Sequence, residues 1–276
     1  MVRAGFVLAV MLCFGADVRA DVKLEAVDYR HGEVQLQGFV AYDDGFQGPR
    51  PGILVVHEWM GLGEYAKQRA TQLAQLGFVA FAADMYGKGV YAKDHQEAGQ
   101  LAGTIRNDRT LMRGRIQAAL EVLKNNPRVD IQKLGAIGYC FGGTSVLELA
   151  RSGAEVDGVV SFNGALGTPM PAKPGAVKAK VLVCHGAADT FVSQEEVAGF
   201  EQEMREAGVE YRLVQYPGAV HSFTVKEAGR DPSKGMAYND EADRQSWNEM
   251  LHFFQALWGT PMIPVAGQSG GEAGRR

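Results

Sequence analysis

A cysteine lies at the centre of the run Gly138-Tyr139-Cys140-Phe141-Gly142-Gly143. This is the G-x-nucleophile-x-G pattern with cysteine where serine usually stands, and residues 133–150 around it indicate a strand, a tight turn and a helix. The small residues permit a strained turn that holds the side chain above the sheet, at the helix N-terminus. Because a helix N-terminus favours negative charge, it favours thiolate over thiol. Cys140 is therefore a candidate nucleophile; the alternative for this segment alone is a glycine-rich turn with a small buried cysteine.

An aspartate and a histidine follow, each just after a predicted strand. Asp189 lies in the loop after the strand 181–184, and His221 lies in the loop after the strand 211–216. Nucleophile, acid and histidine in this order match α/β-hydrolases, and sites in open parallel sheets lie past the carboxyl ends of the strands. Taken singly, Asp189 could be a turn former and His221 a surface histidine. Together with Cys140 they predict a Cys-His-Asp triad.

A carboxylate and a further loop are predicted at the same edge. The apolar strand that begins at Pro51 runs into Glu58, which we expect to lie at the same edge of the sheet as Cys140; the alternative is an exposed carboxylate at a strand end. The loop after this strand supplies the second oxyanion donor in α/β-hydrolases. The backbone N–H groups of Trp59 and Phe141 are therefore predicted to form an oxyanion hole.

The chain resembles the dienelactone hydrolase family of α/β-hydrolases. The resemblance rests on the motifs HEWMGL (57–62), ADMYGKG (83–89), GYCFGG (138–143), HGAADTFV (185–192) and YPGAVHSF (216–223). It implies that Cys140, Asp189 and His221 form the catalytic triad. It also implies that Glu58 holds the resting cysteine and helps to form the thiolate when substrate binds. The activity it implies is hydrolysis of a small-molecule ester or lactone through a cysteine acyl-enzyme.

The chain departs from the family pattern where a substrate carboxylate is recognised. The founding enzyme type places an arginine shortly after the catalytic histidine, whereas residues 222–225 contain none. Arg106 and Arg109 are only loose candidates for a second substrate arginine. Because a bidentate carboxylate clamp needs a guanidinium group, we expect an ester or lactone other than a dianionic lactone.

Alternating strand and helix patterns predict an α/β fold with a doubly wound, mostly parallel sheet and antiparallel N-terminal strands. The predicted strands are 22–29, 34–42, 51–57, 78–85, 133–139, 156–163, 181–184 and 211–216, and the predicted helices are 65–76, 104–123, 141–150, 193–207 and 240–258. About seventeen residues separate the strands 156–163 and 181–184, which is too few for a large cap domain. We therefore expect an open pocket.

Four aromatic residues lie near strand ends, where they could line that pocket. Tyr86, Trp59 and Phe223 are predicted to bind substrate, with ordinary packing as the alternative. Packing is the preferred interpretation for Phe191. The segment 229–236 follows His221 and either edges the site or simply links a strand to a helix.

The two ends of the chain are predicted to lie outside the folded domain, which spans 21–262. Residues 1–20 combine a positive start, an apolar run and a small-residue cleavage site, which is typical of a signal peptide. We expect export to the periplasm or secretion, with no stable membrane span after cleavage because the apolar run is short. The alternative is an uncleaved N-terminal anchor. Residues 263–276 are glycine-rich with a basic end and are predicted to be disordered.

Composition limits the possible partners. The 276 residues, 46% of them hydrophobic, suit one large domain, and a net charge of −4 gives no basic footprint for nucleic acid. The chain contains no CxxC, HExxH or GxxxxGK motif, so we expect no metal and no cofactor. We expect a monomer or a small homo-oligomer.

Two cysteines, Cys140 and Cys184, remain in the predicted mature chain. The strand 156–163 would separate their strands, placing them roughly 9–10 Å apart, whereas a disulfide needs Cα atoms closer than about 7 Å. We therefore expect a free thiol at Cys140 and a buried strand residue at Cys184. Two other functional classes stay open: a non-catalytic binding protein on a hydrolase fold, and a thiol redox protein that uses Cys140.

Overall fold

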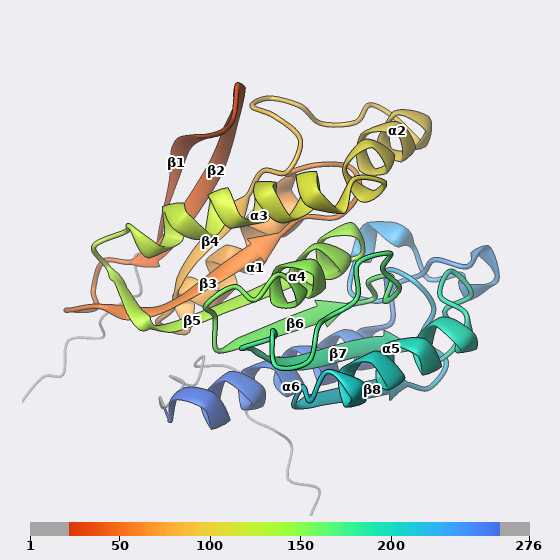
Figure 1. Cartoon of the computed structure of the whole chain (residues 1–276). Helices are drawn as coiled ribbons and strands as arrows, with labels where there is room; N and C mark the ends of the chain where they lie inside the picture. Colours follow the sequence, from red (N-terminus) through yellow and green to blue (C-terminus); the bar gives the residue numbers. More distant parts are fainter. Residues whose placement is uncertain (1–21, 260–276) are drawn as a thin grey trace, which may run out of the picture.

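The computed structural model describes residues 22–259. The predicted signal peptide (1–20), the predicted tail (263–276) and the domain limits at 21 and 262 lie outside the described residues. Eight strands form one sheet in the order β1-β2-β4-β3-β5-β6-β7-β8 (Figure 1). The strands are β1 Val22–His31, β2 Val34–Asp43, β3 Arg50–Val56, β4 Val79–Ala83, β5 Val129–Tyr139, β6 Gly158–Phe162, β7 Lys180–Gly186 and β8 Tyr211–Tyr216.

The strand directions confirm the predicted α/β-hydrolase fold. Strand β1 pairs antiparallel with β2, and β2 pairs antiparallel with β4. Every other neighbouring pair is parallel. The carboxyl ends of β3, β5 and β7 therefore meet at one edge of the sheet, which is where the predicted site residues follow their strands.

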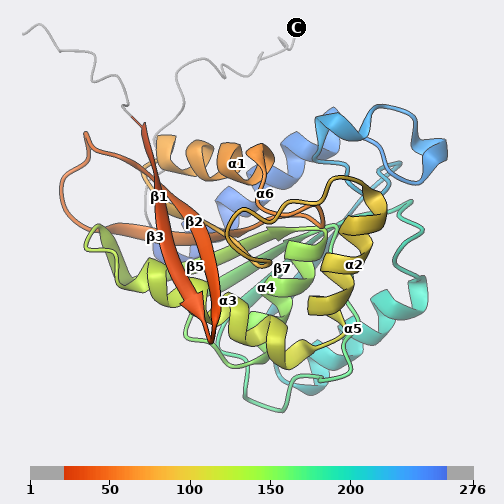
Figure 2. The same ribbon diagram turned by 90° about the horizontal axis from the view of Figure 1, so that it is seen from above.

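Helices cover both faces of the sheet. They are α1 Glu64–Gln75, α2 His95–Arg106, α3 Arg109–Lys124, α4 Phe141–Arg151, α5 Gln194–Glu206 and α6 Asp240–Trp258, with short 3-10 turns η1 Lys226–Ala228 and η2 Pro232–Lys234. Figure 2 shows α1 and α6 on one side of the sheet, with α3, α4 and α5 on the other. None of the helices in residues 22–259 is long and apolar enough to cross a membrane.

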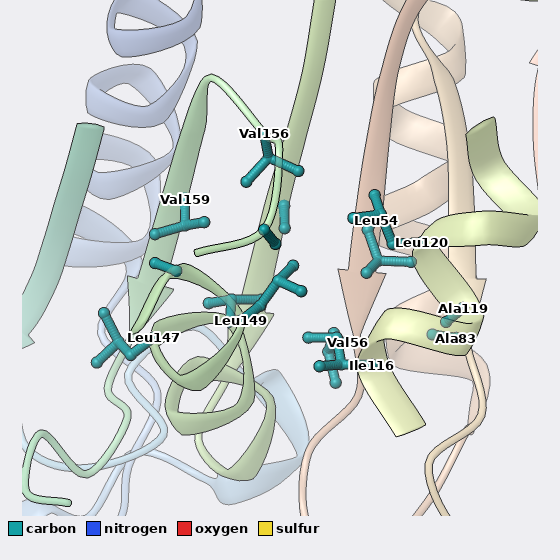
Figure 3. Close-up of a cluster of buried hydrophobic side chains, with 14 of the residues drawn as sticks. Leu54, Val56, Ala83, Ile116, Ala119, Leu120, Leu147, Leu149, Val156 and Val159 are labelled. Atoms are coloured by element: carbon teal, nitrogen blue, oxygen red, sulfur yellow. The ribbon is translucent and has the colours of Figure 1, made fainter. Parts of the chain in front are cut away.

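The central strands are buried on both faces, which is why they are almost continuously apolar. Along β3, Leu54 and Val56 pack in one core cluster, whereas Ile53 and Val55 point to the other face and pack in a second. Figure 3 shows Leu54 and Val56 beside Ile116 and Leu120 of α3. This two-sided packing fixes the sheet edge from which the loops that carry the predicted site residues leave.

The predicted helix 104–123 is wrong in extent, because two helices occupy this region. Helix α2 ends at Arg106 and α3 begins at Arg109. Asp108 caps the second helix by accepting a hydrogen bond from the backbone N–H of Leu111 at 2.9 Å, so the chain can restart a helix there. The buried face of α2 consists of Ala98, Ala102 and Ile105, a pattern too short and weak to indicate a separate helix.

Other expectations about local structure are confirmed. Helix α6 begins and ends at the predicted residues. Ser193 caps α5 by accepting a hydrogen bond from the Glu196 backbone N–H, as its capping-box spacing predicts. No helix occurs between β6 and β7, a fully described stretch, so no cap domain is inserted there.

Candidate active site

Cys140 lies between the end of β5 and the start of α4. Its φ of 53° and ψ of −112° place a non-glycine residue at positive φ, and such strain clusters at functional sites. The neighbouring glycines are needed because the backbone is crowded. A Cβ on Gly138 would collide with the carbonyl group of Gly142, and one on Gly142 would collide with the carbonyl oxygen of Val56. The turn predicted from the sequence is therefore present.

The three residues predicted to form a triad lie together in one chain of contacts. Nε2 of His221 lies 3.0 Å from Sγ of Cys140, and Nδ1 of His221 lies 2.8 Å from Oδ2 of Asp189. Both His221 and Asp189 are buried. The other carboxylate oxygen, Oδ1 of Asp189, accepts a hydrogen bond from the backbone N–H of Phe191, which orients the acid.

The electrostatic surroundings favour a charged imidazole. Burial lowers the pKa of His221, but the negative charge of Cys140 and the hydrogen bond to Asp189 outweigh this effect and raise it to about 10. This is the direction expected when an imidazolium is paired with a thiolate on one side and a carboxylate on the other. The arrangement can therefore hold a charged imidazole between the Cys140 sulfur and the Asp189 carboxylate.

Glu58 lies two residues after the end of β3, at the predicted edge of the sheet. Burial raises the pKa of its carboxyl to about 7, although the positive charge of His221 opposes this. Its side chain has no hydrogen-bond partner among the described residues. The contact expected between Glu58 and the resting cysteine is not formed here, because the sulfur contacts His221 instead.

The two residues that carry the predicted oxyanion donors line the same cavity as the sulfur. Trp59 and Phe141 both line the cavity that contains Cys140. Within residues 22–259 neither backbone N–H donates to another protein group. The Trp59 loop is held by Tyr86, whose hydroxyl donates to the carbonyl oxygen of Trp59 at 2.8 Å. Two unpaired N–H groups beside a nucleophile can bind a developing oxyanion.

The sulfur faces a mostly apolar cavity of about 310 Å³. Its lining consists of Trp59, Gly99, Ala102, Arg106, Cys140, Phe141, Thr144, Ala165, Phe191, Val192, His221 and Met236. Arg106 carries the one guanidinium in this lining, and it has no partner among the described residues. Arg109, the other candidate for a substrate-binding arginine, is buried, and its Nε lies 3.7 Å from the Glu148 carboxylate.

Three predictions about aromatic residues need correction. Phe223 does not line the cavity, because it is fully buried and packs against Tyr216. Tyr86 is also buried outside the lining, where it supports Trp59. Phe191, for which packing was the preferred interpretation, is 59% exposed, lines the cavity and lies with its ring 5.0 Å from that of His221. Trp59 alone of the three predicted substrate contacts lines the cavity.

The sequence interpretation did not single out Met236 or Thr144. Met236 pairs with His221 in an isolated bridge, so the segment 229–236 edges the site. The only signal for this was the position of that segment after His221. Thr144 lies on the first turn of α4, four residues after the nucleophile, a spacing that puts it on the same side of the helix.

Cys184 is a free, fully buried thiol in β7, separated from the strand of Cys140 by β6. Burial raises the pKa of this thiol to about 12, which makes it inert near neutral pH. No group of three or more His, Cys, Asp or Glu residues within 22–259 could hold a metal ion.

Comparison with known proteins identifies the family of the chain. The family model described as "Dienelactone hydrolase family" matches residues 36–258. A solved structure from metagenomic libraries, titled a dienelactone hydrolase-like promiscuous phosphotriesterase, is 40% identical with a TM-score of 0.82; the match covers 87% of this chain and 99% of that one. The solved structure titled m3DLH is 36% identical with a TM-score of 0.82 and coverage of 86% and 98%.

Curated relatives extend over similar lengths. Protein usf of Aquifex pyrophilus is 28% identical over 238 residues, which cover 84% of this chain and 97% of that protein. A protein of Aquifex aeolicus provisionally named carboxymethylenebutenolidase is 29% identical, with coverage of 84% and 97%. Together with the eight-stranded fold, these matches show that the chain is a carboxylic ester hydrolase that belongs to the dienelactone hydrolase family.

Proposed function

We propose that the protein hydrolyses a small carboxylic ester or lactone through a Cys140 acyl-enzyme, with His221 and Asp189 as the other members of the triad. The observation that carries the proposal is the continuous contact chain from Sγ of Cys140 through the His221 imidazole to the Asp189 carboxylate, open to a cavity at its sulfur end. A nucleophile, a base and a group that orients the base are what acyl transfer requires.

In the first half-reaction the Cys140 thiolate attacks the carbonyl carbon, forming a C–S bond while the carbonyl electrons move onto oxygen. The N–H groups of Trp59 and Phe141 stabilise this oxyanion, a contribution of about 3–4 kcal/mol per donor in known cases. The C–O bond then breaks, and Nε2 of His221 gives its proton to the departing alkoxide. A lactone opens by the same step and stays attached through its acyl end.

In the second half-reaction His221, now neutral, takes a proton from water as the water oxygen attacks the thioester. The C–S bond breaks, the acid is released, and the thiolate and imidazolium are restored. Asp189 holds the imidazole orientation and stabilises its charged form throughout. Glu58 lies close enough to His221 for their charges to interact, which supports a role in setting the charge of the resting site.

The cavity favours an acyl group that is uncharged or carries one negative charge. Its lining is mostly apolar and provides a single guanidinium, that of Arg106. Arg109 is committed to Glu148 and to the Arg106 carbonyl oxygen, so it is not available as the second arm of a clamp. These contacts support the exclusion of a dianionic lactone as the natural substrate.

The test is hydrolysis of para-nitrophenyl esters and small lactones by wild type, Cys140→Ala and the matched control Cys184→Ala. Wild type and Cys184→Ala should both turn over at least one ester, whereas Cys140→Ala should lose turnover by about 10³-fold or more. Mass spectrometry of wild type quenched with a slow ester should find the acyl group on the peptide that contains Cys140. Retained turnover in Cys140→Ala would refute the assignment of the nucleophile.

The two other functional classes predict different results. A non-catalytic binding protein would leave Cys140 unreactive toward iodoacetamide. The raised pKa of His221, whose charged imidazole lies beside the sulfur, instead supports a reactive thiol. A thiol redox protein needs a resolving cysteine, and the buried Cys184 is a poor one. Rapid reaction with peroxide and recovery with thiols, without esterase activity, would favour the redox class.

We also propose that residues 1–20 direct export to the periplasm or the medium. The protein recovered from fractionated cells should begin at Asp21 and be found outside the cytoplasm. An N-terminus at Met1 in the membrane fraction would instead support the uncleaved anchor.

A further inference from the structure

A second cavity of about 650 Å³ adjoins the one that contains the nucleophile. Trp59 and Met236 line both cavities and form the boundary between them. Ser222, the residue that follows His221, lines the second cavity but not the first. The two spaces therefore meet at Trp59 and Met236.

The wall of the second cavity carries more carboxylates than ammonium groups. It is lined by the carboxylates of Glu58, Glu64 and Glu227 and by one ammonium group, that of Lys67. The ammonium group is already neutralised, because it lies 3.1 Å from Glu64. This leaves Glu58 and Glu227, whose charges are close enough to affect each other.

Glu58 is a half-buried carboxyl group that lines this cavity without a hydrogen-bond partner in the part of the chain that the structure describes. A carboxylate that is partly removed from water is stabilised by a nearby positive charge or hydrogen-bond donor. The nearby Arg69 does not fill this role, since its guanidinium pairs with Asp243. A ligand with a positive charge or a hydrogen-bond donor would satisfy Glu58.

Aromatic side chains supply a further cation-binding feature. Trp59 and Tyr91 line the same cavity as the two carboxylates, and so does Tyr65, whose ring already lies against the Arg69 guanidinium. The hydroxyl of Tyr65 already donates to Oγ1 of Thr224 at 2.7 Å, so it needs no ligand to satisfy it. Aromatic faces together with carboxylates form the usual environment for an alkylated ammonium group.

We propose that this second cavity binds a cationic ammonium group on the alcohol half of the substrate, while the acyl half occupies the apolar cavity at Cys140. The proposal rests on the ester-hydrolase function above. The alcohol oxygen must lie near Nε2 of His221 to receive its proton, and the second cavity begins at the next residue, Ser222. In this proposal the leaving alcohol extends past Trp59 and Met236 toward Glu58 and Glu227.

The test compares two esters of the same acid whose alcohols have nearly the same shape and differ in charge. Butyrylcholine carries a quaternary ammonium, and 3,3-dimethylbutyl butyrate carries a neutral carbon in its place. Proton release at pH 8 gives kcat/KM for each ester. We expect the full-length enzyme to prefer the cationic ester by about tenfold or more, the scale of one good cation–π and charge contact.

Two variants are expected to change the ratio of kcat/KM for the cationic ester to that for the neutral ester in opposite directions. Glu227→Gln, which removes a charge from an exposed residue, should lower the cationic-to-neutral ratio by about three- to tenfold. Lys67→Gln should raise the ratio, because it frees the Glu64 carboxylate. The matched control is Glu155→Gln, an exposed carboxylate outside both cavities, which should leave the ratio as in wild type.

The outcomes separate this inference from the function on which it rests. Hydrolysis of both esters with equal efficiency, and no change of ratio in Glu227→Gln, would overturn the cation site while leaving the esterase intact. Failure to hydrolyse any ester in the panel would overturn the proposed function itself. A ratio that moves alike in Glu227→Gln and Glu155→Gln would indicate long-range electrostatics and would also overturn the site.

Discussion

The carboxylate of Asp189 lies 2.8 Å from Nδ1 of His221, on the side of the imidazole away from Cys140. This contact fixes the tautomer and supports the charged form of the ring. We expect Asp189→Asn to lower kcat by roughly 10²- to 10⁴-fold, because the amide favours the wrong tautomer and no longer offsets the imidazolium charge. Steady-state kinetics on a para-nitrophenyl ester, with circular dichroism to verify folding, measures the effect. Wild-type turnover in a folded variant would remove Asp189 from the triad.

The raised pKa of Glu58 predicts that this residue costs the protein stability at alkaline pH. Its pKa is about 7 in the folded state, against an ordinary value of 4.5, so the folded protein binds the extra proton between these pH values and stability falls as pH rises through them. Above pH 7 the full cost is present, at most about 3 kcal/mol. Below about pH 4.5 the carboxyl is protonated in both states and the cost disappears.

Glu58→Gln should therefore be more stable than wild type at pH 8 and nearly equal to it at pH 4.5. Urea denaturation at the two pH values, with Glu155→Gln as the exposed control, measures the difference. A gain that is the same at both pH values would show that it does not arise from ionisation of Glu58.

Arg106 and Arg109 are three residues apart, but only Arg106 lines the nucleophile cavity. Because its guanidinium is unpaired among the described residues, we expect it to favour an acyl group that carries a carboxylate. Arg106→Gln should lower the ratio of kcat/KM for a hemisuccinate ester to that for the matching butyrate ester, by about three- to tenfold. Kinetics at low and high salt checks the charge dependence, and Lys173→Gln at the exposed β6–β7 loop serves as the control. An unchanged ratio would exclude Arg106 from acyl recognition.

Gly142 is required by the close approach of β3 to the start of α4. A Cβ at this position would collide with the Val56 carbonyl oxygen. Gly142→Ala should destabilise the protein by about 1–3 kcal/mol and displace the nucleophile turn, which lowers activity as well. By contrast, Gly199 of α5 has free space around it, so Gly199→Ala should stabilise the protein by roughly 0.5–1 kcal/mol through helix propensity. Thermal and urea unfolding of the two variants provides the comparison, and equal effects would contradict the packing argument.

The strand pattern was sufficient to predict the fold, and the residues after each strand were sufficient to predict that Cys140, Asp189 and His221 lie together. Cys140, Asp189 and His221 each follow a parallel strand, and parallel strands bring their carboxyl ends to one edge of the sheet. Local capping signals likewise predicted the start of α5 at Ser193. The split into α2 and α3 was missed because the short, alanine-rich face of α2 gives little hydrophobic periodicity.

Only the tertiary structure decided which side chains face the substrate. The sequence places Phe191, Phe223, Arg106 and Arg109 in suitable segments, but the packing turns Phe191 and Arg106 toward the cavity while Phe223 and Arg109 are buried. It also brings Met236 against His221 and places the Cys140 sulfur on the imidazole rather than on Glu58. Periodicity and chain order are local properties that a sequence carries directly. The direction of a loop side chain depends on which distant segments pack around it, and that is determined only when the whole chain has folded.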